Sequence, residues 1–106
     1  MAPVILITGG SRGVGAATAL LAAQQGFSVA VNYVADARAA DGVVQTIRAG
    51  GGTAMAVQAD VAHEAQVLAM FSAVDAQLGT LTALVNNAGV VDVAARLDEM
   101  TVARIK

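Results

Sequence analysis

Three glycines near the start of the sequence stand at a spacing that can bind phosphate. They lie in the segment TGGSRGVG, residues 8–15, between an apolar run and a helical pattern. Gly9 permits a sharp turn where a Cβ would clash. Gly13 lets the main chain approach a pyrophosphate, and Gly15 lets the helix pack closely on the strand. The free N–H groups at the start of the helix attract the anion. We therefore expect a pyrophosphate to be held by Gly9, Gly10, Ser11, Arg12, Gly13, Val14 and Gly15.

Glycine turns are common, so the prediction of a phosphate site depends on the elements that flank this turn. Residues 4–7 form an apolar, β-rich run of the kind found in parallel sheets covered on both faces. Residues 13–25 have helical spacing, with Val14, Ala17 and Leu21 as the apolar positions, and stop at a glycine that can end a helix. No Gly-Lys-Ser/Thr follows the turn, which excludes a P-loop.

The same alternation of strand and helix continues along the chain. Further strands are expected at residues 28–33, 54–58 and 81–85. Helices are expected from a cap at Asp36 through residue 49, at residues 63–78, and from residue 98 to 106. Their inward positions are Val43, Val44, Ile47, Val67, Met70, Phe71 and Val74. Unbroken alternation predicts an α/β, Rossmann-like, doubly wound parallel sheet, with strand order 3-2-1-4 and helices on both faces.

Composition excludes several classes of function. The formal charge of −2 and the lack of a basic run argue against nucleic-acid binding. No apolar run approaches the roughly 18 residues that span a bilayer, and no basic leader precedes the first strand. With no cysteine and one histidine, the sequence offers no thiolate nucleophile and no metal site. We expect a cytoplasmic protein with neither a nucleic-acid nor a membrane partner.

The spacing T-G-x-x-x-G-x-G differs from the usual dinucleotide fingerprint and resembles the short-chain dehydrogenase/reductase family. Its look is closest to the 3-oxoacyl-carrier-protein reductase and glucose dehydrogenase members. Two further segments lie in register with that family: Asp60 with Val61, and the N-N-A-G of residues 86–89. The resemblance implies that Asp60 bonds the adenine amine and that the backbone of Val61 helps hold the ring. It also implies that Asn87, Ala88 and Gly89 line the ribose. From the residues alone, a turn cap is the alternative for Asp60, and Asn86 suits a structural role at a strand end.

The end of the second strand bears on the choice of nicotinamide cofactor. An acid there usually accepts a hydrogen bond from the ribose 2′-hydroxyl of NAD. This sequence has the neutral pair Asn32 and Tyr33 instead, which we assign to the cofactor site. Arg12 in the glycine turn can make a bidentate contact with a 2′-phosphate, although a solvated loop side chain is the alternative. Asp36 is near in sequence but suits a helix cap better. We expect NADP(H) rather than NAD(H).

The family's reacting residues are not found in this sequence. The resemblance implies a Ser and a Tyr-x-x-x-Lys pair, but the one tyrosine, Tyr33, has Ala37 four residues later, and the one lysine is Lys106. His63 is expected to be a solvated residue at a helix end. We therefore assign no catalytic residue and expect residues 1–106 to be the N-terminal dinucleotide-binding part of a single Rossmann domain that continues further.

Three functions remain open on this basis. The first is an oxidoreductase that transfers hydride between the nicotinamide and a small carbonyl or alcohol substrate, as a homo-oligomer (dimer or tetramer) when complete. The alternative is a catalytically inactive nucleotide-binding module, and a binder of another nucleotide on the same fold is a third possibility. The sequence favours the first, because an inactive module would still need the open edge of its fourth strand to be covered, and nothing in the sequence does this.

Overall fold

The computed structural model of the protein describes residues 2–9 and 13–86. Strands and helices alternate along this part of the chain without interruption. The elements are β1 (Val4–Thr8), α1 (Gly13–Gln24), β2 (Ser28–Tyr33), α2 (Ala37–Ala49), β3 (Ala54–Gln58), α3 (Glu64–Gln77) and β4 (Leu81–Asn86). Each expected element within these ranges is present, and its ends differ from expectation by at most one residue. The helix expected at residues 98–106 lies outside the described residues.

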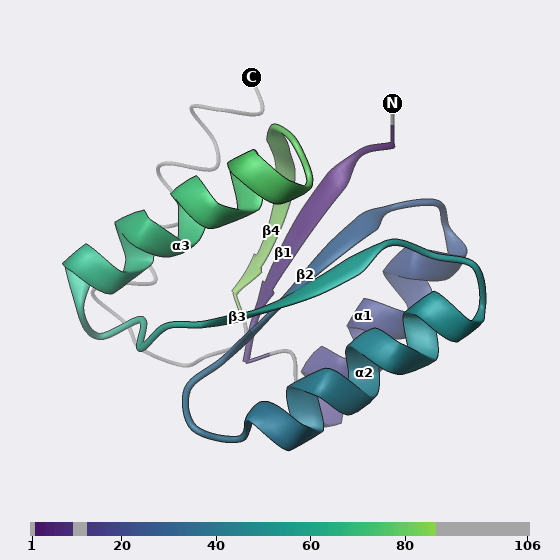
Figure 1. The fold of residues 1–106 in the computed structure, drawn as a ribbon, viewed down its shortest axis with the longest axis horizontal. Helices are drawn as coiled ribbons and strands as arrows, with labels where there is room; N and C mark the ends of the chain where they lie inside the picture. Colours follow the sequence, from purple (N-terminus) through teal and green to yellow (C-terminus); the bar gives the residue numbers. More distant parts are fainter. Residues whose placement is uncertain (1, 10–12, 87–106) are drawn as a thin grey trace.

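The four strands form one parallel sheet in the order β3-β2-β1-β4. Helix α3 covers one face of the sheet, and α1 and α2 lie side by side on the other (Figure 1). Each face of the central strands therefore meets a helix, which explains why β1 and β2 are apolar almost throughout. The fold class and the strand order predicted from the sequence are confirmed.

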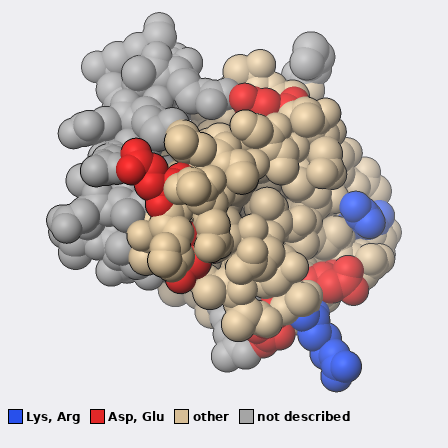
Figure 2. All heavy atoms as spheres, turned by 60° about the vertical axis from the view of Figure 1, so that its left-hand side comes forward, with Lys and Arg blue, Asp and Glu red and all other residues tan. Residues whose placement is uncertain are grey.

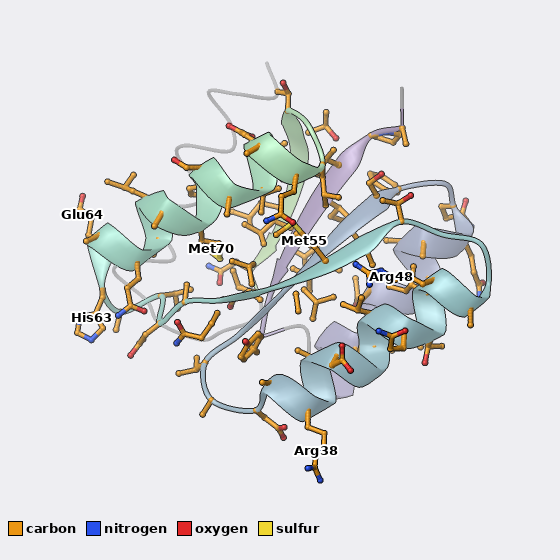
Figure 3. The ribbon with its side chains drawn as sticks, viewed as in Figure 1. Arg38, Arg48, Met55, His63, Glu64 and Met70 are labelled. Atoms are coloured by element: carbon orange, nitrogen blue, oxygen red, sulfur yellow. The ribbon has the colours of Figure 1, made fainter. Side chains whose placement is uncertain are left out.

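Two apolar clusters of different composition lie on the two faces. The α3 cluster contains large side chains of α3 packed on alternate residues of the strands, among them Met70, Phe71, Leu6 and Met55. Met55 of β3 and Met70 of α3 both belong to this cluster and lie between the sheet and α3 (Figure 3). The cluster under α1 and α2 uses small residues of the helices, such as Ala19, Ala22 and Ala40, against β-branched residues of the sheet.

The apolar positions that gave α1 its helical spacing in the sequence do not form its buried face. Val14 and Leu21 are 74% and 60% exposed, and the buried residues are Gly15, Ala19 and Ala22. The reason is the distance between helix and sheet: a stripe of residues with no side chain, or a single methyl, lets α1 pack close to β1 and β2. In α2 and α3 the expected positions are correct, with Val44, Ile47 and the four apolar residues of α3 buried and Val43 partly buried.

The ends of the helices follow the expected chemistry. The Asp36 carboxylate accepts a hydrogen bond from the Ala39 N–H at 3.0 Å, which confirms it as the cap of α2. Gly26 and Gly79, which follow α1 and α3, have φ angles of 94° and 106°, a region that favours glycine. None of the helices in the described ranges has the length and apolar character needed to cross a membrane.

Candidate functional site

The turn after β1 lies at the edge of the sheet where all four strands end. In a parallel sheet the carboxyl ends of the strands meet at one edge, which is where α/β folds bind ligands. Here Thr8 of β1 pairs with Asn86 of β4, and Tyr33 of β2 pairs with Gln58 of β3. Gly9, which follows β1, has a φ angle of 62°, and Gly13, the first residue of α1, has a φ angle of 54°. Both conformations are ones that residues with a Cβ rarely adopt.

The beginning of α1 has the properties of a phosphate cradle. Its first N–H groups have no acceptor within the helix, and the helix dipole places partial positive charge there. Beside Gly13, a Cβ would meet no heavy atom of the described residues within 4 Å, so the main chain faces open space. Gly15 is buried against the sheet, and Val14 is exposed at the mouth of the turn. The described part of the turn therefore fits the pyrophosphate that the sequence predicts, while Gly10, Ser11 and Arg12 lie outside the described residues.

Asn32 and Tyr33, which the sequence analysis placed together at the ribose, point to opposite faces of the sheet. Successive side chains alternate along a strand. Tyr33 packs partly exposed on the face of α1 and α2, which is the side where the glycine turn enters α1. Asn32 has no exposed surface, and its amide bonds main-chain atoms of the protein. Of this pair, Tyr33 is therefore the better candidate for a side-chain contact with a ribose.

Asp60 lies just past the end of β3, at the same edge. One carboxylate oxygen, Oδ1, accepts from the Ala62 N–H at 2.9 Å, as in the turn cap that the sequence left open. The other, Oδ2, lies 3.6 Å from Nε2 of His63, whose side chain is 65% exposed while that of Asp60 is 38% exposed. One oxygen is thus engaged in the turn and the other lies beside an exposed histidine, and the side chain as a whole stays partly exposed, so capping and ligand binding are compatible. His63 stands at the beginning of α3, beside Glu64 (Figure 3).

Val61 and the residues after β4 complete the predicted set. The side chain of Val61 is buried in the α3 cluster, which leaves its main chain as the part that can meet an adenine ring. Asn86 Oδ1 lies 3.2 Å from the Thr8 hydroxyl, which supports the structural role considered for this residue. Asn87, Ala88 and Gly89 lie outside the described residues.

Sequence reasoning assigned Asn32 to the cofactor site as a ligand contact and missed its bonds within the protein. The buried amide of Asn32 bonds Gly9, the first residue of the turn. The signal was available in the alternation of β2: Ala30 faces α3, so residue 32 must face it too. An amide on an inward position at a strand end needs partners in the protein.

The charged residues of the described ranges, taken together, give little attraction for a phosphate. Among the described residues, carboxylates outnumber guanidinium groups: Asp36, Asp41, Asp60, Glu64 and Asp75 against Arg38 and Arg48. Figure 2 shows separate carboxylates, and few cations, on the face that carries the beginning of α3. Arg38 points away from the fold (Figure 3). In this part of the chain, an anion would be bound by main-chain N–H groups and the end of α1.

Comparisons with known proteins agree with this geometry. The chain is 49% identical over 102 residues to an uncharacterized oxidoreductase of Escherichia coli, covering 96% of this chain and 41% of that protein. It is 47% identical over 85 residues to the 3-oxoacyl-[acyl-carrier-protein] reductase of Staphylococcus aureus, covering 80% of this chain and 35% of that one. The chain thus spans about two fifths of the length of the curated relatives it matches.

Solved structures show the same similarity in three dimensions. A short-chain dehydrogenase/reductase from Serratia marcescens superposes with a TM-score of 0.80 at 39% identity, over 83% of this chain and 36% of that one. A dehydrogenase/reductase from Sinorhizobium meliloti superposes with a TM-score of 0.81 at 40% identity, over 85% of this chain and 36% of that one. The family model for short chain dehydrogenases matches residues 3–106. The chain therefore belongs to the short-chain dehydrogenase/reductase family.

Proposed function

We propose that this chain is the cofactor-binding part of an NADP(H)-dependent oxidoreductase, and that its glycine turn holds the pyrophosphate. The observation that supports this most directly is the backbone conformation of the two glycines that flank the turn, Gly9 after β1 and Gly13 at the start of α1. Gly9 and Gly13 have positive φ angles of 62° and 54°, and the main chain faces open space beside Gly13. Such a turn at the carboxyl edge of a parallel sheet presents N–H groups to an anion.

The preference for NADP(H) is argued from charge at the end of β2. Tyr33 brings no negative charge to the position where an acid would repel a 2′-phosphate. The nearby carboxylate of Asp36 is engaged in capping α2. Arg12 supplies a cation in the sequence of the turn itself. These features together favour a phosphorylated ribose.

The other predicted contacts belong to the same proposal. Asp60 and the main chain of Val61 would hold the adenine, and Asn87, Ala88 and Gly89 would line the ribose. Bound nicotinamide supplies the hydride chemistry, and this chain's own residues bind and orient the cofactor. The whole protein would act on a small carbonyl or alcohol substrate in the cytoplasm and assemble as a homo-oligomer. Its reacting Tyr and Lys are not a pair within residues 1–106.

Direct titration of the protein with NADPH and NADH tests the proposal. We expect the dissociation constant to be lower for NADPH. The Tyr33→Asp variant should weaken NADPH binding by about tenfold or more, because like charges in close contact repel. NADH binding should be unchanged or tighter, since the new carboxylate can accept from the 2′-hydroxyl. Tyr33→Phe is the matched control, as it keeps the ring that packs on the core. Tighter binding of NADH than of NADPH by the wild type would overturn the NADP(H) preference.

A further inference from the structure

The side chain of Asn32 is fully buried at the point where β2 ends. Its Oδ1 atom accepts from the N–H of Gly9 at 3.2 Å. Its Nδ2 atom donates to the carbonyl of Ala59 at 3.0 Å and lies 3.4 Å from the carbonyl of Val57. The residue has no exposed surface, so water does not compete for these bonds. A single amide thus joins the first residue of the glycine turn to the end of β3.

The orientation of this amide is fixed by its neighbours. Its oxygen faces a donor, the Gly9 N–H, while its nitrogen faces the carbonyl oxygens of Val57 and Ala59. Turning the amide by 180° would set nitrogen against N–H and oxygen against carbonyl oxygen. The side chain therefore needs one acceptor atom and one donor group at fixed positions. An ionised carboxylate has no donor for the two carbonyls, and a single hydroxyl has only one atom with which to reach both sides.

The amide of Asn32 holds Gly9, a residue whose backbone can otherwise adopt many conformations. Gly9 has φ 62° and is the point at which the chain leaves β1 for the turn. Because glycine has wide conformational freedom, a bond to its N–H orients the peptide from which the turn starts. The Ala59 carbonyl at the other end of the bridge immediately precedes Asp60, which is proposed to hold the adenine.

We infer that Asn32 is a positioning residue for the cofactor, acting through Gly9 and Ala59 rather than by contact. It fixes the glycine turn relative to the end of β3, so that the phosphate-binding and adenine-binding groups keep one spacing before the cofactor arrives. Preorganisation of this kind lowers the cost of binding. The inference rests on the proposed function.

The first test is the affinity of an Asn32→Ala variant for NADPH. Loss of the bridge should raise the dissociation constant by about tenfold, the equivalent of one such bond lost from the bound state. Gly52→Ala is the control for stability. Its Cβ would meet Cγ2 of Ile47 at 2.8 Å, so it should destabilise the fold at the opposite edge of the sheet and leave NADPH affinity unchanged.

The second test separates positioning from mere stability by means of pH. In Asn32→Asp the introduced carboxyl faces two carbonyl oxygens in a buried place, which raises its pKa above the value in the unfolded chain. The protonated form reproduces the asparagine pattern, with one oxygen accepting from Gly9 and the hydroxyl donating to Ala59. The stabilisation is therefore present at low pH and lost as pH rises through the raised pKa. The ratio of dissociation constants, variant to wild type, should fall toward one as pH is lowered.

The outcomes distinguish the inference from the proposed function. If the wild type binds neither NADPH nor NADH, the proposed function fails. If it binds NADPH and the folded Asn32 variants bind within about twofold of it at every pH, the positioning role is overturned. Should neither variant fold, hydrogen exchange of the Gly9 amide in the wild type decides. A protected amide in the free protein supports the inference, and an amide protected only after NADPH binds contradicts it.

Discussion

At each edge of the sheet a threonine hydroxyl links β1 to β4, but one of these threonines is buried and the other is exposed. At the carboxyl edge, the hydroxyl of Thr8 on β1 lies 3.2 Å from Asn86 Oδ1 and 3.3 Å from the Val85 carbonyl, on β4. At the amino edge, the hydroxyl of Thr82 on β4 accepts from the Val4 N–H at 3.0 Å and donates to the Val4 carbonyl at 2.9 Å. Thr8 has no exposed surface, whereas Thr82 is exposed.

The two edges differ in how deeply their polar groups are buried. At the carboxyl edge the polar groups Thr8 and Asn32 are buried beside the glycine turn, where unsatisfied atoms would be costly. At the amino edge the bonds are made near solvent. There Thr82 is the residue at which the pairing of β1 with β4 shifts register. At the same edge the Arg48 guanidinium donates to the Ala54 carbonyl at 2.9 and 3.2 Å. Arg48 reaches from α2 toward the edge strand β3 (Figure 3). Losses at the carboxyl edge should therefore affect both stability and cofactor, and losses at the amino edge stability alone.

The largest effect is expected for Thr8→Val. The substitution keeps the shape of this buried side chain and removes the hydroxyl, so the two acceptors on β4 lose their donor. Stability should fall by about 2 kcal/mol, measured as the free energy of unfolding in urea. NADPH affinity should fall a few-fold, because Thr8 precedes Gly9. A loss of stability with unchanged NADPH affinity would show that the two edges do not differ in this way.

An intermediate effect is expected for Asp36→Ala. This surface residue at the carboxyl edge caps α2, and loss of the cap should cost about 1 kcal/mol in urea unfolding. Asp36→Asn is the matched control, since it keeps the capping oxygen and removes the charge. It should retain stability. Its NADPH affinity should be equal or higher if the carboxylate lies near the 2′-phosphate, whereas weaker NADPH binding by Asp36→Asn would mean that the charge assists the cofactor.

The fold and much of this edge could be predicted from the sequence because their signals are local. The glycine turn, the cap at Asp36 and the apolar face of α3 are each defined by a few neighbouring residues, and all were found. The buried face of α1 could not be predicted in this way, because the helix GVGAATALLAAQ is apolar on almost every side and two of its most apolar residues, Val14 and Leu21, are exposed. Close approach to the sheet decided which face was buried.

The role of Asn32 shows a second limit. Its type and its place at the end of β2 suggested a ligand contact, but its partners Gly9 and Ala59 are 23 and 27 residues away in sequence. Such a bridge depends on the pairing of three strands, which no short segment encodes. To predict this bridge, one needs both the register of the sheet and the face of β2 to which residue 32 points.

The smallest effect is expected for Thr82→Val, which applies the Thr8 substitution to the other edge. Water can replace the lost hydroxyl at this exposed position, so the free energy of unfolding should fall by only about 0.5 kcal/mol. The dissociation constant for NADPH should not change, because the carboxyl ends of the strands are untouched. If Thr82→Val were as destabilising as Thr8→Val, the register shift at Val4 would matter more than burial. The polar bonds of the amino edge would then be as necessary to the fold as those beside the turn.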